Sequence, residues 1–296
     1  MANQQYAHKF ELGVPFRTYL EDYGPKWEEL AWMRRSEDGI LEVQLHWGED
    51  SCRFSESVHS GLVGLALDIQ RDPDNECVII TGTGKDFLNE PDKEEAFAEG
   101  ERIYPHSATY DWWWMHQTRI FNAFIDIPVP VIAAIHGGCS FHPETWLMSD
   151  YIFVEPGTYY VDKHVHGSHC IPADGLNDLI GYIVGRNRVK SIFLNGEVID
   201  AQKGIDLGLW HEIVPREELM DRARAFARNT ILCLEPMHRR MWREVFVQPF
   251  RELMAKSVRA SLAQEAYAAE LCVVRPGANH ALQFREEYQK TMGENK

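Results

Sequence analysis

The chain has 296 residues, 45% of them hydrophobic, and a formal net charge of −15, so it can bury one large core together with a helical extension. The acidic balance argues against nucleic acid as a partner, because phosphate binding requires clustered cations. No apolar run reaches the roughly 18 residues that a membrane span needs, and the first residues lack the basic and apolar regions of a signal peptide.

The cysteines and histidines give no sign of a disulfide or metal framework. Six cysteines are scattered along the chain without a CxxC pair, which in a chain of this length predicts reduced thiols in the cytoplasm. His164, His166 and His169 lie close together, but no cysteine or carboxylate spacing completes a recognisable ligand set. We therefore expect a cytoplasmic protein without a metal ion.

The first third of the chain alternates between helical and strand patterns. Residues Arg17–Arg34 predict a helix, and Asp38-Gly39 then marks a turn before a strand at Ile40–His46. A second helix is predicted from Ser55 to Gln70, with Ser55 as its N-cap. The continuous apolar run Val78–Thr81 is typical of a strand that is buried on both faces.

The remaining two thirds continue this alternation and end in helices. In chain order we predict a helix at Asp111–Ile127, a strand at Val129–Ile135, a helix from His142 or Pro143 to Asp150, strands at Tyr151–Val154, Thr158–Val161 and His211–Val214, and helices from Leu176 and from Glu217 onward. Strand–strand–helix units followed by a helical tail predict an α/β fold. We expect residues 1–216 to form a core with an N-terminal extension and residues 217–296 a helical C-terminal region.

Several motifs carry a resemblance to a known family. They are Thr81-Gly82-Thr83-Gly84 with Phe87, Val129–Ala134, His142-Pro143-Glu144, Met148-Ser149-Asp150, Ile171-Pro172 with Asp174-Gly175, and Leu262-Ala263 with Glu265-Ala266. From about Val14 to Ala269 the chain resembles the crotonase (enoyl-CoA hydratase/isomerase) superfamily, and within it the β-diketone hydrolases such as 6-oxocamphor hydrolase. The resemblance implies a spiral of ββα units with a helical C-terminal region that forms trimers or dimers of trimers.

The triplet His142-Pro143-Glu144 decides which chemistry the resemblance implies. Crotonases place a glycine run here so that a backbone N–H approaches a thioester oxygen, whereas proline has no N–H and histidine brings a titratable ring. The β-diketone hydrolases carry out a retro-Claisen hydrolysis without a cofactor. The implied substrate is a small β-diketone, cyclic and apolar, that water converts to a keto acid.

Catalytic residues follow from the resemblance position by position. His142 matches the histidine that hydrogen-bonds a substrate carbonyl, Asp174 the partner of the base histidine, and Glu265 an acidic residue from the C-terminal helices. The base itself falls between His164 and His166. We prefer His166, because Gly167-Ser168 follows it and gives the loop freedom, and alternation would point both rings to one face of a strand.

Substrate contacts are expected from four further side chains. Phe54 stands where the camphor enzyme has a tryptophan, so it cannot donate a hydrogen bond, and Phe87 belongs to the matching Thr-Gly-Thr-Gly region. Glu144 is expected to support His142. Trp113 lies in the run Trp112-Trp113-Trp114, which cannot all face one side of a helix and can border an apolar cavity.

Two other functions remain open from the sequence. The first is a CoA-thioester hydratase or isomerase of the same superfamily. It is disfavoured by the missing glycine run and by Pro91, which stands where the superfamily supplies its first oxyanion N–H. The second is a non-catalytic binding protein on a crotonase fold, disfavoured by histidine, aspartate and glutamate at three separated family positions.

Overall fold

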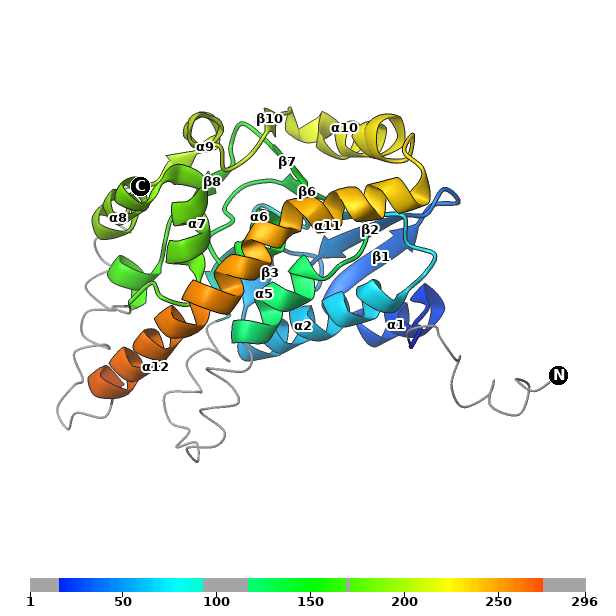
Figure 1. Cartoon of the computed structure of the whole chain (residues 1–296). Coiled ribbons are helices and arrows are strands. Elements are labelled where there is room, and N and C mark those ends of the chain that lie inside the picture. The colour runs from blue at the N-terminus through cyan, green and yellow to red at the C-terminus, as the bar shows by residue number, and fades with distance from the viewer. Residues whose placement is uncertain (1–15, 93–116, 169–170, 274–296) are drawn as a thin grey trace, which may run out of the picture.

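A six-stranded sheet forms the centre of the computed structural model, which describes residues 16–92, 117–168 and 171–273 (Figure 1). Its strands, in spatial order, are β1 (Ala31–Arg35), β2 (Ile40–Leu45), β4 (Cys77–Gly82), β6 (Val131–Ile135), β7 (Tyr151–Val154) and β10 (Glu212–Ile213). β1 is antiparallel to β2 and the others run parallel. Two small sheets pair β3 (Cys52–Phe54) with β5 (Leu88–Pro91) and β8 (Tyr159–Tyr160) with β9 (Ile199–Asp200).

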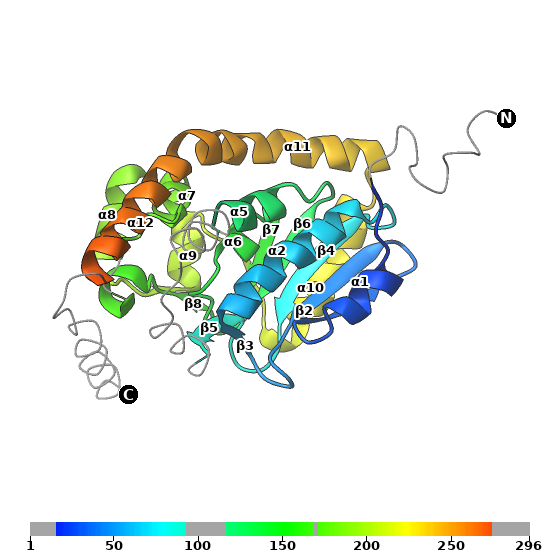
Figure 2. The ribbon, with the colours of Figure 1, turned by 90° about the horizontal axis from the view of Figure 1, so that it is seen from below.

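Helices cover both faces of the main sheet, as Figure 2 shows from below. Along β4, Val78 and Ile80 join the core that contains α2 (Glu56–Arg71) and α5 (Gln117–Ile125). The alternate residues Cys77 and Ile79 pack with α10 (Leu219–Phe226) on the other face. Successive side chains of a strand point to opposite faces, so a strand covered on both sides is apolar throughout. The α/β fold expected from the sequence is confirmed.

The predicted N-terminal helix is too long. The structure has a short α1 (Leu20–Lys26), and Trp32 lies on β1, which pairs residue by residue with β2 around the Asp38-Gly39 turn. Pairing with β2 outweighs the helical pattern of this segment. The second helix begins where it was expected, because the Ser55 hydroxyl accepts a hydrogen bond of 3.1 Å from the Val58 N–H.

The second half of the chain is mostly helical, and its C-terminal helices pack against the core. After α6 (Glu144–Leu147), a single turn, come α7 (Leu176–Val184), α8 (Arg186–Asn195), α9 (Ala201–Leu207), α11 (Pro236–Leu253) and α12 (Arg259–Val273), with π-helical turns at Ala227–Ile231 and Met254–Val258. α11 runs across α5, and α12 continues beyond it (Figures 1 and 2), where Ser261 of α12 donates a hydrogen bond to Asp178 of α7. Within the described ranges, no helix combines the length and the apolar character that crossing a bilayer requires.

Helix α11 is held to the core by a buried arginine. Nη1 of Arg243 lies 2.5 Å from Oδ2 of Asp150, and the same guanidinium donates to the carbonyl oxygens of Phe124 and Ile127. Asp150 also accepts the Val131 N–H at the start of β6. Because a buried charge that loses its partner is costly, this pair fixes where α11 lies and therefore where α12 passes.

Candidate active site

His142 lies at the turn between β6 and α6 in an unusual backbone conformation. Its φ of 45° is the only positive φ of a non-glycine residue within the described ranges. Nδ1 of His142 lies 2.5 Å from Oε1 of Glu144, and both side chains are buried. Such strained residues cluster at functional sites, where the surrounding structure holds them in place. The turn therefore fixes the ring direction, and Glu144 fixes which nitrogen is turned away from it.

The ring of His142 lies among other aromatic rings. Nε2 is buried and has no hydrogen-bond partner among the described residues. The ring of Phe54 lies 5.2 Å from that of His142 and stacks on Phe141 at 4.9 Å. The ring of His59, from α2, lies 4.7 Å from His142. The sequence did not single out His59, since one histidine on the buried side of an amphipathic helix gives the same pattern as a core residue.

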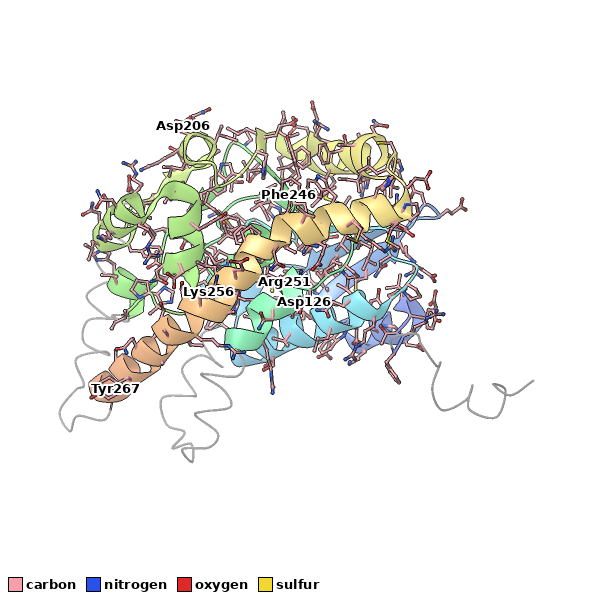
Figure 3. All side chains as sticks on the ribbon, viewed as in Figure 1. Asp126, Asp206, Phe246, Arg251, Lys256 and Tyr267 are labelled. Atoms are coloured by element: carbon pink, nitrogen blue, oxygen red, sulfur yellow. The ribbon has the colours of Figure 1, made fainter. Side chains whose placement is uncertain are left out.

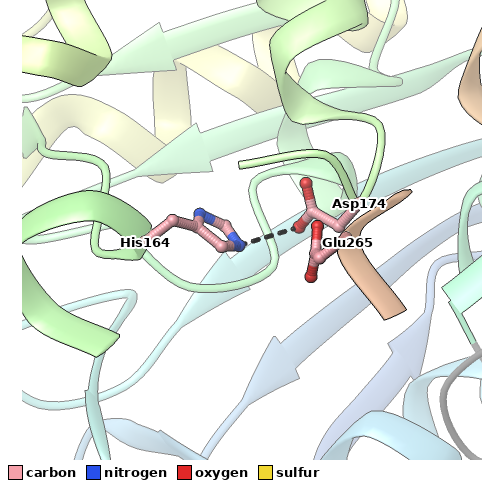
Figure 4. A group of neighbouring side chains, drawn as sticks. All are labelled: His164, Asp174 and Glu265. Atoms are coloured by element: carbon pink, nitrogen blue, oxygen red, sulfur yellow. Dashed lines mark ion pairs between the residues drawn. The ribbon is translucent and has the colours of Figure 1, made fainter. Parts of the chain in front are cut away.

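A second histidine is held between two aspartates. His164 begins a π-helical turn, His164–Ser168, that follows β8. Its Nδ1 lies 2.9 Å from Oδ2 of Asp162, and its Nε2 lies 3.4 Å from Oδ2 of Asp174. Figure 4 shows the Nε2 edge of the ring facing Asp174. The segment that leads to His164 lies against the turn that carries His142, because the Val161 N–H donates a hydrogen bond of 3.2 Å to the Ser140 hydroxyl.

Glu265 reaches this site from α12. Its Oε2 accepts a hydrogen bond of 2.8 Å from the Ala173 N–H, beside Asp174 (Figure 4). Only 2% of Glu265 is exposed, so its carboxyl group faces the site without bulk solvent. His164 and Asp174 thus come from one stretch of the chain before α7, whereas Glu265 comes from the distant α12.

The charges of these groups depend on one another. Burial alone would lower the pKa of His164, but the carboxylates of Asp174 and Asp162 hold it well above its usual value. Burial alone would raise the pKa of Asp174, yet the neighbouring His164 lowers it. Burial, with the charge of Asp174, raises the pKa of Glu265 to about 8. The pKa values of these two neighbouring carboxyl groups are therefore shifted in opposite directions, so that Glu265 can hold a proton while Asp174 is an anion.

The same three side chains could hold a divalent cation. One nitrogen of His164 and one oxygen each of Asp174 and Glu265 lie within 4.8 Å of one another. Metal ligands bind in their deprotonated form, so a cation here would have to displace the proton that the raised pKa keeps on Glu265. The atoms are also close enough to hold a water molecule. The absence of a metal ion therefore stays a prediction.

The preferred base histidine does not lie in this cluster. His166 is exposed, and its Nε2 lies 2.8 Å from the carbonyl oxygen of Leu194 on α8. The segment forms a helical turn where alternation required a strand, so residues two apart point in different directions. Phe87 is fully buried in the core. Trp113 lies outside the described residues.

Replacing Glu265 with glutamine is expected to change how stability depends on pH. Because the folded pKa of about 8 exceeds the usual 4.5, the folded protein binds the extra proton between these values, and its free energy of unfolding falls as pH rises through this window. Glutamine does not titrate and removes this pH dependence. Between pH 5 and pH 8 the free energy of unfolding of Glu265→Gln should therefore rise, relative to that of wild type, by on the order of a few kcal/mol. Urea unfolding at both pH values measures it. Equal differences at the two pH values would contradict the buried proton.

A cavity elsewhere in the molecule contains none of the predicted site residues. It has a volume of about 470 Å³ and lies between β1, β2, β4 and α10. Burial lowers the pKa of its histidine, His136, to about 4. Two of its arginines, Arg34 and Arg224, already pair with Glu42. Among its described lining residues no histidine is paired with a carboxyl group, so we place the candidate active site at His142 and His164.

Comparisons with known proteins show which family has this fold. A family model described as enoyl-CoA hydratase/isomerase matches residues 35–270. A β-diketone hydrolase from the cyanobacterium Anabaena sp. PCC 7120, solved with (S)-3-oxocyclohexyl acetic acid, is 28% identical with a TM-score of 0.76, covering 86% of this chain and 98% of that one. The 1,2-epoxyphenylacetyl-CoA isomerase of Escherichia coli (strain K12) is 23% identical over 197 residues, 65% of this chain and 73% of that protein. The chain belongs to the enoyl-CoA hydratase/isomerase family.

Proposed function

We propose that this protein hydrolyses a carbon–carbon bond of a β-diketone, without a cofactor, to give a keto acid. The observation that carries the proposal is the buried Nε2 of His142, which is left without a partner in the described structure and beside Phe54 and Phe141. When His142 and Glu144 together hold two protons, Nε2 carries an N–H, and such a donor with apolar walls suits the carbonyl of a small, hydrophobic diketone. The named ligand of the Anabaena hydrolase contains one ketone and one carboxylic acid, the two groups that such a hydrolysis leaves.

The backbone of the β6–α6 turn supports a side-chain donor over a thioester oxyanion hole. The N–H groups of Gly137 and Gly138 donate to the carboxylates of Glu155 and Asp86, at 2.8 and 2.6 Å. Those of Cys139 and Phe141 donate to the carbonyl oxygens of Tyr159 and Leu88. Pro143 and Pro91 have no N–H. These donors are therefore used within the protein or absent, whereas thioester chemistry needs them aimed at the substrate oxygen.

The reaction begins with water near Nε2 of His164. In its neutral form His164 takes one proton from the water, and the water oxygen bonds to one carbonyl carbon of the diketone. The Asp174 carboxylate, 3.4 Å from Nε2, stabilises the imidazolium that results. A tetrahedral oxyanion forms on the attacked carbonyl.

Cleavage of the carbon–carbon bond then needs a proton and a place for negative charge. The oxyanion collapses to a carboxylic acid, and the bonding electron pair moves to the central carbon and its remaining carbonyl as an enolate. His142 donates to a carbonyl oxygen through Nε2 when it and Glu144 together hold two protons, one of them between the pair. Glu265, which keeps its proton until about pH 8, protonates the enolate carbon to give the ketone. The proton that His164 took from water then passes to the Glu265 carboxylate, which restores both groups.

The proposal is tested by incubating the full chain with cyclic β-diketones and, in parallel, enoyl-CoA thioesters. Mass spectrometry should find a diketone product heavier by one water, with the thioesters unchanged. Each assay is repeated in EDTA, and undiminished conversion there would show that no exchangeable metal ion is required. Loss of conversion in Asp174→Asn, with a normal unfolding transition, ties the reaction to this site.

Two outcomes would sink the proposal in different ways. Hydration or isomerisation of a thioester, with every diketone untouched, would place the chain with the CoA enzymes. No reaction in either panel, together with tight binding of a diketone, would favour a binding protein on the same fold. The arms share one preparation, so a misfolded sample cannot produce either pattern selectively.

We also propose that the protein assembles as a homotrimer or a dimer of trimers through its C-terminal helices. On α11, the buried side carries Arg239 and Arg243, while the outer side exposes large apolar residues. Figure 3 labels one of them, Phe246, on α11. The exposed set is Met237, Met241, Trp242, Val245 and Phe246. A contiguous apolar surface of this kind is typical of a protein–protein interface.

Placing a charge on that surface is expected to dissociate the assembly. Val245 is 64% exposed and Phe246 57%, so glutamate at both positions costs the isolated chain little and opposes burial against another copy. Sedimentation velocity should find a trimer or hexamer for wild type and a monomer for Val245→Glu/Phe246→Glu. Glu29→Lys, at an exposed site before β1, should keep the wild-type mass. A double variant that sediments like wild type would place the interface elsewhere.

A further inference from the structure

Asp162 holds His164 more closely than Asp174 does. Its Oδ2 lies 2.9 Å from Nδ1 of the ring, and its Oδ1 accepts a hydrogen bond of 3.0 Å from the backbone N–H of the same histidine. The Asp162 side chain is 1% exposed. By contrast, Asp174 lies 3.4 Å from Nε2, beyond the usual N–H···O range, and its Oδ1 accepts the Leu176 N–H.

We propose that Asp162, and not Asp174, fixes the tautomer of neutral His164, with the proton on Nδ1 and the lone pair on Nε2. The consequence for catalysis rests on the proposed function, because it makes Nε2 the nitrogen that takes the proton from water. Asp162 acts through His164 and is therefore a positioning residue, as the buried aspartate is in hydrolytic triads. The lone pair then faces the side of the ring on which Asp174 and Glu265 lie (Figure 4), and one His164 nitrogen and one oxygen of each carboxyl group lie within 4.8 Å of one another.

Because Asp162 also accepts the backbone N–H of His164, one substitution, Asp162→Asn, tests this assignment. A backbone N–H is always a donor, so in Asp162→Asn the amide oxygen must stay on it. The amide NH₂ then faces Nδ1, and two donors cannot share a hydrogen bond. Nδ1 must become the acceptor, and the ring proton moves to Nε2, which loses its lone pair.

The matched variant Asp174→Asn leads to the opposite tautomer. Here the Leu176 N–H keeps the amide oxygen in place of Oδ1, so the NH₂ group faces Nε2 of His164. An NH₂ donor at Nε2 leaves the lone pair there and the proton on Nδ1 beside Asp162. Two isosteric changes on either side of one ring therefore predict different tautomers, which a general loss of packing would not do.

The experiment is ¹⁵N NMR of the full chain with labelled histidine, at a pH where His164 is neutral, with its signals assigned by their loss in His164→Gln. Wild type and Asp174→Asn should carry the proton on Nδ1, and Asp162→Asn on Nε2. For diketone hydrolysis, Asp162→Asn should lower kcat on the order of 10³-fold to 10⁴-fold with KM little changed. Asp178→Asn, another buried aspartate whose partners are Arg186 and Ser261, should keep its activity.

The outcomes separate this inference from the proposed function. Nε2–H in wild type, unchanged Nδ1–H in Asp162→Asn, or both nitrogens protonated at every accessible pH would each overturn it. If Asp162→Asn does not fold, the wild-type and Asp174→Asn spectra still decide, since Nε2–H in either one is incompatible with it. The tautomer is read without substrate, so inactivity toward every diketone would sink the proposed function and leave this result standing.

Discussion

Replacing His164 with alanine is expected to lower kcat for diketone hydrolysis by about 10²-fold to 10⁴-fold, the usual contribution of a positioned general base. Its ring is the one that lies between Asp162 and Asp174, with Nε2 turned toward Glu265. Removal of the ring leaves two buried carboxylates facing the site without their cationic partner. We therefore also expect a lower unfolding temperature, and initial rates must be measured well below it.

The neighbouring histidine provides the control. His166 is exposed and bonds to the carbonyl oxygen of Leu194, away from both aspartates. His166→Ala should therefore keep kcat within about twofold, as surface substitutions usually leave a fold unchanged. If His166→Ala lost activity while His164→Ala kept it, the base would be His166 and the π-helical turn would have to rearrange during the reaction.

The second large effect is expected at His142. Removing one donor that stabilises an oxyanion commonly costs about 10²-fold to 10³-fold in kcat, and His142→Ala removes the only ring nitrogen that we assign to a substrate carbonyl. The fall should be in kcat more than in KM, because negative charge on the carbonyl oxygen develops only as water adds.

Backbone strain at His142 calls for a variant that keeps the turn. Its φ of 45° suits asparagine, which adopts this conformation more readily than most residues, so His142→Asn should fold as wild type does. Its shorter side chain does not reach the position of Nε2, and kcat should still fall. Near-normal kcat in both variants, with intact far-ultraviolet circular dichroism, would remove His142 from the reaction.

The sequence predicted the parts of this fold that depend on local pattern. The buried run at Val78–Thr81 and the capped helix from Ser55 are set by side chains within a few residues, and the structure confirms both. The helix expected at Arg17–Arg34 is present at Leu20–Lys26 but was predicted too long, because pairing of Ala31–Arg35 with β2 is decided by a partner strand and not by local propensity.

The site was predictable to the extent that the resemblance supplied it. His142, Asp174 and Glu265 came from matched motifs; the structure places Asp174 and Glu265 together beside His164, and the roles of all three stay predictions. The choice between His164 and His166 could not be made from the sequence. It depends on whether the loop is extended or helical, because this decides which of the two rings points toward Asp174. Asp162 gave no signal, since its contact with a backbone N–H exists only once the turn has formed.

The path of α11 determines how late in synthesis Glu265 can join the rest of the candidate site. Glu265 contacts Ala173, which precedes it by 92 positions, and α11, which leads to α12, is held by the contact between Arg243 and Asp150. Domains made on the ribosome fold from their N-terminal side, and contacts between distant residues form late. The nascent chain can therefore complete its sheet and both histidine turns while it still lacks Glu265, the proton donor of the proposed reaction, so we expect activity only once α12 has docked.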